Sequence, residues 1–136
     1  MNTLEAQILT PEGTLFDDDV VGVKVPGTLG NFEVKPMHAS IISSLEIGQI
    51  LVRLASGGEA IFAVSGGFVE VHNNKLTLLA EAAEPADEID VDRARDAKKR
   101  AQERLSSEDK KIDKERAKQA LKRAENRIRV ADKALA

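Results

Sequence analysis

The stretch FVEVHNNKLTLL, residues 68–79, decides the fold of the first part of the chain. Apolar and β-branched residues dominate both of its ends, and residues 72–75 (His-Asn-Asn-Lys) separate them. Asparagine tolerates the positive φ angles that tight turns require, so this pattern is typical of a β-hairpin. The stretch therefore predicts two neighbouring antiparallel strands.

Working outward, several other short segments before residue 68 also read as strands. They are residues 4–8, 21–25, 32–34, 50–54 and 60–64. Most alternate apolar with polar or small residues, as in Val21, Val23 and Val25, whereas residues 60–64 are apolar throughout and predict a strand buried on both faces. Gly- and Pro-containing turns separate the segments, and we interpret Asp17–Asp19 as a solvated turn. Many short strands at nearly even spacing predict an all-β sandwich or barrel.

The second part of the chain has the composition of helices. All nine glycines lie at or before Gly67 and all four prolines at or before Pro85, so nothing later breaks a helix. Small apolar residues recur there at three- and four-residue steps: Ala94, Ala97, Ala101 and Leu105, then Ala117, Ala120, Ala124, Ile128, Ala131 and Leu135. Asp87 and Asp90 are candidate N-caps, and residues 106–109 are the expected turn and a candidate cap of the second helix. The pattern predicts an antiparallel two-helix hairpin of marginal stability, because narrow alanine stripes bury little apolar area.

Charge divides the chain at the same place. Residues 1–89 hold 4 Lys and Arg against 13 Asp and Glu, whereas residues 90–136 hold 16 against 10. We therefore predict an α+β protein with a β-domain at residues 1–84, a linker at residues 85–89 and a helical domain at residues 90–136.

Composition and missing motifs exclude several classes of function. The lack of cysteine and the presence of only His38 and His72 argue against a metal site. The phosphate-binding pattern G-x-x-x-x-G-K-[ST] is absent and no acid–base constellation stands out, so we expect no enzyme activity. The lack of Trp and Tyr, and the Asp and Glu interleaved with the basic residues, argue against nucleic-acid binding. No apolar run approaches the ~20 residues that span a bilayer, and the N-terminus lacks the features of a signal peptide.

The order of the two parts, together with several local motifs, resembles a known family. The motifs are residues 10–13 (Thr-Pro-Glu-Gly), Gly27 and Gly30, Pro36-x-His38-Ala39, residues 64–71 (Val-Ser-Gly-Gly-Phe-Val-Glu-Val), Ile89-Asp90-x-x-Arg93-Ala94, and residues 120–127 (Ala-Leu-Lys-Arg-Ala-Glu-Asn-Arg). Over its whole length the chain resembles the epsilon subunits of bacterial rotary, F-type ATP synthases. The motif Ile89-Asp90-x-x-Arg93-Ala94 is similar to the ATP-binding motif of the bacillus-type members.

This resemblance implies a non-catalytic rotor subunit of a proton-transporting ATP synthase. The β-domain would bind the gamma subunit and rest on the c-ring. The helices would either fold as a hairpin or extend along gamma into the alpha/beta catalytic head, where they inhibit ATP hydrolysis. The protein would sit peripherally on the cytoplasmic side of the bacterial cell membrane, held there only through partner subunits.

A candidate ATP site combines helical spacing with this resemblance. Arg93 and Arg100 are seven residues apart and Arg123 and Arg127 four apart, so each pair shares one face of its helix. Guanidinium groups bind phosphate oxygens bidentately. The resemblance further implies that Ile89 and Ala94 line the adenine pocket, with Asp90 and Glu84 near the base: Glu84, Ile89, Asp90, Arg93, Ala94, Arg100, Arg123 and Arg127 form the expected set.

Other interpretations of these residues stay open. Arginines on alanine-rich helices are commonly a solvated face, which would leave a subunit without ATP sensing or a small basic-helix interaction module. In the favoured interpretation no cofactor is required, and ATP is a regulatory ligand that stabilises the folded, non-inhibitory hairpin.

Overall fold

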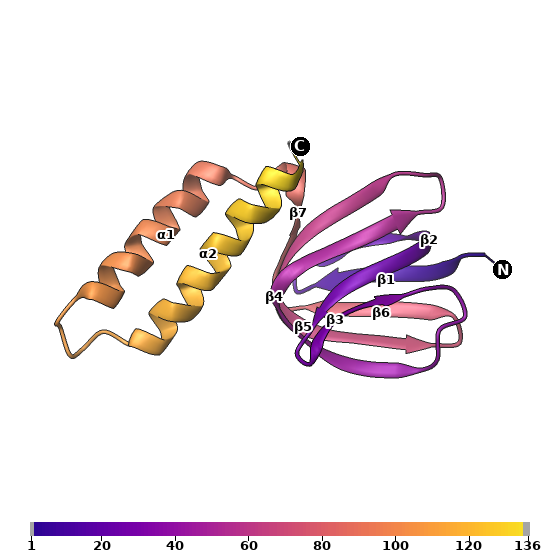
Figure 1. Ribbon diagram of the computed structural model, residues 1–136, viewed down its shortest axis with the longest axis horizontal. Coiled ribbons are helices and arrows are strands. Elements are labelled where there is room, and N and C mark those ends of the chain that lie inside the picture. Colours follow the sequence, from indigo (N-terminus) through magenta and orange to yellow (C-terminus); the bar gives the residue numbers. More distant parts are fainter. Residues whose placement is uncertain (1, 135–136) are drawn as a thin grey trace. The chain divides into compact units, whose positions relative to one another are not determined.

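A computed structural model describes residues 2–134 and divides the chain into two compact units, Met1–Pro85 and Ala86–Ala136. The first unit is all β and the second is helical (Figure 1). The segment expected as a linker, residues 85–89, contains the last residue of strand β7 and a short 3₁₀ turn. Leu135, expected on the second helical stripe, and the predicted domain end at residue 136 lie outside the described residues.

The first unit is a closed barrel, which confirms the predicted all-β fold. Its strands are β1 (Leu4–Thr10), β2 (Gly13–Gly27), β3 (Gly30–Val34), β4 (Ile41–Leu54), β5 (Glu59–His72), β6 (Lys75–Ala80) and β7 (Ala83–Pro85). The hydrogen-bonded order β1-β6-β5-β4-β2 closes through pairing of β2 with β1. Strand β3 adds to β2 and β7 adds to β5, and all pairs are antiparallel except β1 with β6.

The predicted hairpin joins β5 and β6 through a two-residue turn. Asn73 and Asn74 have φ angles of 50° and 60°, the left-handed values of a type I′ turn. The Asn74 side chain also accepts a hydrogen bond from the Met37 N–H at 2.8 Å and donates one to the Thr3 carbonyl at 2.9 Å. This turn therefore also fixes two segments that are distant in sequence.

Strand β5 unites two segments that the sequence pattern separates, residues 60–64 and 68–71. Gly66 and Gly67, with φ angles of +89° and +132°, carry the strand between them. A β-carbon at Gly67 would lie 2.1 Å from the carbonyl oxygen of Leu79 on β6. Only glycine permits this approach, so the Gly-Gly pair lets one long strand pair with β4, β6 and β7.

Branched aliphatic side chains fill the barrel. The core consists of Leu4, Ala6, Ile8, Val20, Val23, Val25, Val34, Leu45, Ile50, Val52, Phe62, Val64, Val69, Val71, Leu76, Leu78 and Ala80. At its edge the rings of Phe16 and Phe62 meet edge to face, with centroids 5.9 Å apart. Burial of this set supplies the main free energy of folding of the first unit.

Three details of the strand predictions were wrong. Asp17–Asp19 are exposed, as expected, but they lie within β2 and pair with β1 instead of forming a turn. Val21 is 38% exposed, because a bulge between Val20 and Gly22 shifts the alternation and buries Val20 instead. Strand β4 begins at Ile41, well before the predicted segment, because its first half pairs with the second half of β5.

The second unit contains a 3₁₀ turn, η1 (Ala86–Glu88), and two helices, α1 (Val91–Ser106) and α2 (Lys114–Ala134). The helices run side by side in opposite directions (Figure 1), which confirms the predicted hairpin. Ala94 and Ala101 of α1 are buried, as are Ala117 and Ala124 of α2, so alanines form the seam.

The helix caps are partly as expected. Asp90 caps α1, since its side chain accepts a hydrogen bond from the Arg93 N–H, whereas Asp87 lies in η1. The predicted cap of α2 at residues 106–109 was wrong. Asp113 takes this role and accepts from the Arg116 N–H at 3.1 Å, because the turn between the helices continues to residue 113.

Candidate functional site

The start of α1 brings together four of the expected site residues. Asp90 Oδ1 accepts the Arg93 N–H at 3.1 Å and thereby fixes the first turn. Ile89 is 8% exposed and Ala94 is fully buried, whereas the Arg93 side chain is exposed. Two buried apolar side chains and an exposed guanidinium therefore lie within about one helical turn of each other. Because Asp90 acts as the N-cap, its carboxylate has a structural role in addition to any contact with a base.

The two arginine pairs lie on the same flank of the hairpin. Each residue turns an α-helix by about 100°, which places Arg93 and Arg100 about 100° from the alanine seam of α1. Arg123 lies at a similar angle from the seam of α2, and Arg127 about 60° from it, both in the same rotational sense. The two helices face each other and run in opposite directions. Side chains that are rotated from their seams in the same sense, each viewed along its own helix, therefore lie on the same side of the hairpin. We call this side the arginine flank.

The arginines also lie at compatible heights along the hairpin. With residue 106 ending α1 and residue 114 beginning α2, Arg93 lies near the level of Arg127. Arg123 falls between the levels of Arg93 and Arg100, which are about 10 Å apart along the axis. Arg93, Arg100 and Arg123 are exposed and Arg127 is partly exposed. The four guanidinium groups are thus spread over about 10 Å along the hairpin, a length comparable with that of a small polyanion.

Sequence reasoning missed two further members of the arginine flank. Arg104 and Arg116 lie at the same angle from their seams and at the same level, near the turn. The described lysines of the two helices lie on the opposite flank or on the outer surface: Lys98, Lys99, Lys114, Lys118, Lys122 and Lys133. Applying the 100° period to every basic residue, instead of to the motif alone, would have found this segregation.

The carboxylates of α1 and α2 themselves lie off the arginine flank. The Asp and Glu residues of the helices lie on the outer surface (Asp92, Asp96, Glu103, Glu115) or on the opposite flank (Glu125, Asp132). Arg95, one of the two helix arginines outside the flank, pairs with Asp92 at 3.8 Å. The flank therefore concentrates guanidinium groups, the side chains best suited to bind phosphate or carboxylate oxygens.

Glu84 belongs to a different unit from the other seven expected residues. It lies in β7, paired with Ala63 of β5, and belongs to the first unit. Within residues 2–134, no group of three or more His, Asp or Glu side chains is placed to hold a metal ion. The arginines of the second unit are therefore groups whose chemistry suits an anion.

Two family models match the chain, and together they cover nearly all of it. The β-sandwich domain of the ATP synthase delta/epsilon chain matches residues 3–86, and the long α-helix domain of the same chain matches residues 87–132. The division between the two models falls next to the division between the two units of the structure.

Similar chains are ATP synthase epsilon chains. That of Salinibacter ruber is 44% identical over 110 residues, which cover 75% of this chain and 74% of the relative. That of Pelotomaculum thermopropionicum is 47% identical over 105 residues, 76% and 77% of the two chains. That of Alkalihalophilus pseudofirmus is 43% identical over 107 residues, 79% and 80%.

Solved structures show the same fold at low sequence identity. A chain of the Euglena gracilis mitochondrial ATP synthase superposes with a TM-score of 0.83 at 20% identity, covering 100% of this chain and 83% of that one. A chain from the central stalk and c-ring of the Tetrahymena thermophila enzyme gives 0.59 at 19% identity, covering 97% and 96%. The chain therefore belongs to the epsilon chains of ATP synthase, which are structural and regulatory, non-catalytic subunits of the central stalk.

Proposed function

We propose that the helical hairpin is an inhibitory arm whose folded form is stabilised by bound ATP. The observation that carries this proposal is the arginine flank, where two helices contribute Arg93, Arg100, Arg123 and Arg127 to one side. A triphosphate that contacts arginines of both helices holds the helices together. ATP acts here as a regulatory ligand, and no cofactor is required.

The packing of the hairpin supports a switch. Its seam is built mainly from alanines, and each buried methyl group contributes only about 0.8 kcal/mol. A ligand that binds only the folded form stabilises it by RT ln(1 + [L]/Kd), about 2.7 kcal/mol at a hundredfold excess over Kd. This free energy is comparable with the weak docking of the helices, so the ATP concentration sets which form dominates.

Each expected residue has a role in this site. The four arginines bind the phosphates, while Ile89 and Ala94 form the apolar side of the base pocket. Asp90 holds the first turn of α1 in place and lies near the base, and the role of Glu84, a residue of the first unit, is to accept a hydrogen bond from the amino group of the base or to orient an arginine. The arrangement gives affinity without hydrolysis, because the groups assigned to the phosphates are all arginines, which stay protonated and cannot act as a general base.

The proposed partners are other subunits of the ATP synthase complex. We propose that the barrel binds the gamma subunit and rests on the c-ring. When ATP leaves, the arm extends along gamma and the arginine flank contacts an acidic surface of the alpha/beta head. Opposite charges steer this docking and favour one orientation. Rotation in the direction of ATP hydrolysis is thereby blocked.

The location of the protein also depends on its partners. As an epsilon chain it is a subunit of a membrane-bound complex. No helix of the described part of the chain is long and apolar enough to cross a membrane. We propose that the subunit is peripheral, on the cytoplasmic side of a bacterial cell membrane, and contacts the membrane only through other subunits.

An ATP titration of the full chain with matched arginine variants tests the sensing claim. We expect ATP to raise the melting temperature of the hairpin and Arg93→Ala to raise the Kd about tenfold or more. Arg95→Ala removes the same charge two residues away on the opposite flank and should change the Kd less than about twofold. Equal losses in both variants, or no response to millimolar ATP, would contradict ATP sensing and leave the stalk role in place.

A further inference from the structure

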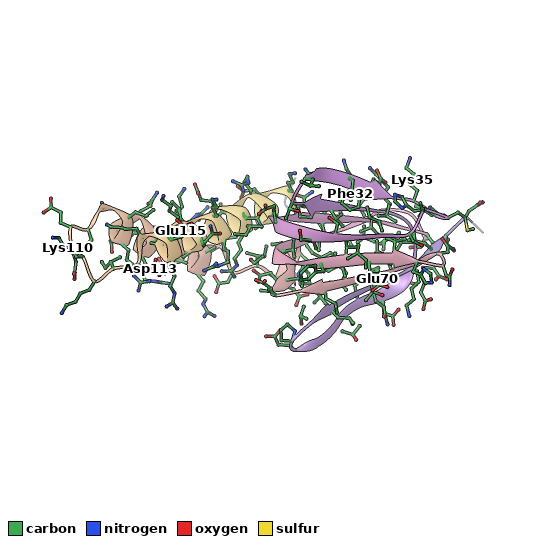
Figure 2. All side chains as sticks on the ribbon, turned by 90° about the horizontal axis from the view of Figure 1, so that it is seen from below. Phe32, Lys35, Glu70, Lys110, Asp113 and Glu115 are labelled. Carbon is green, nitrogen blue, oxygen red and sulfur yellow. The ribbon has the colours of Figure 1, made fainter. Side chains whose placement is uncertain are left out.

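The turn between α1 and α2, residues 107–113, is held by side chains instead of by a helix breaker. It contains no Gly or Pro, and none of its residues has a positive φ angle. The Ser107 hydroxyl accepts the Asp109 N–H at 3.1 Å, and the Asp109 carboxylate accepts the Lys111 N–H at 2.9 Å. Figure 2 shows Lys110 at the tip of this turn, with Asp113 and Glu115 where α2 begins. Every residue of the turn is therefore able to adopt helical angles without strain.

Lys114 makes the contacts that join the two helices at this end. Its ammonium group donates hydrogen bonds to the carbonyl oxygens of Arg104 and Leu105, both at 2.9 Å, and to that of Ser107. These carbonyls lie at the C-terminal end of α1, where carbonyl groups lack the N–H partner four residues later; that of Arg104 also accepts the N–H of the C-cap residue Ser107 at 3.3 Å. One side chain of α2 thus caps α1.

The position of Lys114 in its own helix is otherwise unfavourable. It is the first residue of α2, and the N-terminus of a helix carries partial positive charge, which repels a cation. The C-terminus of α1 carries partial negative charge and attracts one. A lysine at this position therefore stabilises the hairpin through α1 and gives no such benefit to α2 alone.

We propose that Lys114 is the latch of the arm, a positioning residue that holds the hairpin closed and keeps the arginines of α1 level with those of α2. The inference rests on the proposed switching of the arm. In a continuous helix the carbonyls of Arg104, Leu105 and Ser107 accept the N–H groups four residues later, so they no longer need a cap. Lys114 then lies about 15 Å along the axis from Arg104 and cannot reach it.

The latch contacts therefore exist in only one of the two forms. An interaction made in one form alone shifts the equilibrium between them. Loss of the ammonium group lowers the folded fraction, and the apparent Kd for ATP rises by the factor by which that fraction falls. Lys114 thus acts on ATP affinity without contacting ATP.

The distance between labels on the two helices tests the latch without relying on ATP. The chain has no native cysteine, so Lys99→Cys and Lys122→Cys place two spin labels at similar levels on the outer surfaces of α1 and α2. Packed helix axes lie about 8–10 Å apart, whereas 23 residues of continuous helix span about 35 Å. The temperature is raised, without ATP and below the unfolding of the barrel, until the unsubstituted arm populates both short and long distances.

We expect Lys114→Met to raise the ratio of open to closed forms about tenfold, as the loss of charge-assisted hydrogen bonds predicts. Lys118→Met, one turn later on the same flank, should leave the ratio within about twofold. Lys114→Arg keeps a cation able to reach the carbonyls and should restore at least half of the closed population. These results together would support a latch specific to this position.

Two outcomes would overturn the latch. One is a Lys114→Met ratio equal to that of Lys118→Met, and the other is an arm that keeps the short distance until the barrel unfolds. A parallel ATP titration of the unsubstituted chain separates this inference from the sensing proposal. Opening controlled by Lys114 without any ATP response would retain the latch and remove the sensor.

Discussion

The barrel and the hairpin are both held by burial of apolar side chains, but the barrel buries much larger ones. The barrel core contains only two alanines among seventeen buried side chains, and the rest are Val, Leu, Ile and Phe. In the second unit most buried residues are alanines, namely Ala86, Ala94, Ala101, Ala117, Ala124 and Ala131. A fully buried Leu or Ile contributes about 1.5–3 kcal/mol, several times more than an alanine methyl group. The barrel is therefore held by a larger hydrophobic free energy than the hairpin, as the proposed switch requires.

The two units also differ in how the chain turns. In the barrel, glycines and asparagines with positive φ fix the turns, as at Asn73 between β5 and β6 and Gly57 between β4 and β5, and no alternative structure accommodates them easily. In the hairpin the turn at residues 107–113 needs no such residue. A turn made of side-chain hydrogen bonds is reversible, so the difference in turn chemistry matches the difference in proposed function.

Substitution of Gly67 should have the largest effect on this comparison. A β-carbon there meets the Leu79 carbonyl at 2.1 Å and must also adopt a φ of +132°, so we expect Gly67→Ala to destabilise the barrel by roughly 3 kcal/mol or more. Gly13→Ala is the matched control, because Gly13 has a φ of +128° but no atom within 4 Å of the position that a β-carbon would take. It should cost about 1–2 kcal/mol. Urea unfolding measures both, and equal costs would show that the clash with β6 is absent.

Truncation of one leucine in each unit compares the two cores directly. Leu78 is fully buried in the barrel, so Leu78→Ala should lower the free energy of unfolding of that unit by about 2–5 kcal/mol. Leu121 of α2 is only partly buried, and Leu121→Ala should cost about 1 kcal/mol or less. Residue-resolved unfolding by NMR separates the two units. A cost at Leu121 as large as that at Leu78 would contradict the weak seam.

Removal of the α1 cap gives the smallest expected effect. Asp90→Ala loses the hydrogen bond to the Arg93 N–H and should destabilise α1 by about 1 kcal/mol, while Asp90→Asn retains a good cap. Helix content by circular dichroism and the Kd for ATP are measured on both variants. If Asp90→Asn weakens ATP binding as strongly as Asp90→Ala, the carboxylate contributes more than the cap.

The parts of the fold that local chemistry dictates were predictable from sequence. The hairpin at Asn73–Asn74 and the two helices follow from turn residues and from a period of three to four residues. The bulge at Val20–Gly22, the length of β4 and the strand role of Asp17–Asp19 were not predictable, because they depend on which strands pair across the closed barrel. Register is a long-range property, and local alternation does not contain it.

The candidate site was also only partly predictable from the sequence. The spacing of Arg93 and Arg100 placed each pair on one helical face, but the turn length and the antiparallel direction are needed to bring both pairs to one flank. Those two facts also reveal Arg104 and Arg116. The contacts of Lys114 have no sequence signature, since a lysine at the start of a helix looks unfavourable until the preceding helix is placed beside it.

Amide hydrogen exchange of the full chain, with and without ATP, tests most directly whether the hairpin is a separate, ATP-stabilised unit. We predict that amides of α1 and α2 open with a much lower free energy than those of the barrel, and that ATP raises protection in the two helices only. Helix and barrel amides that open together with one free energy, unchanged by ATP, would contradict this view of the hairpin.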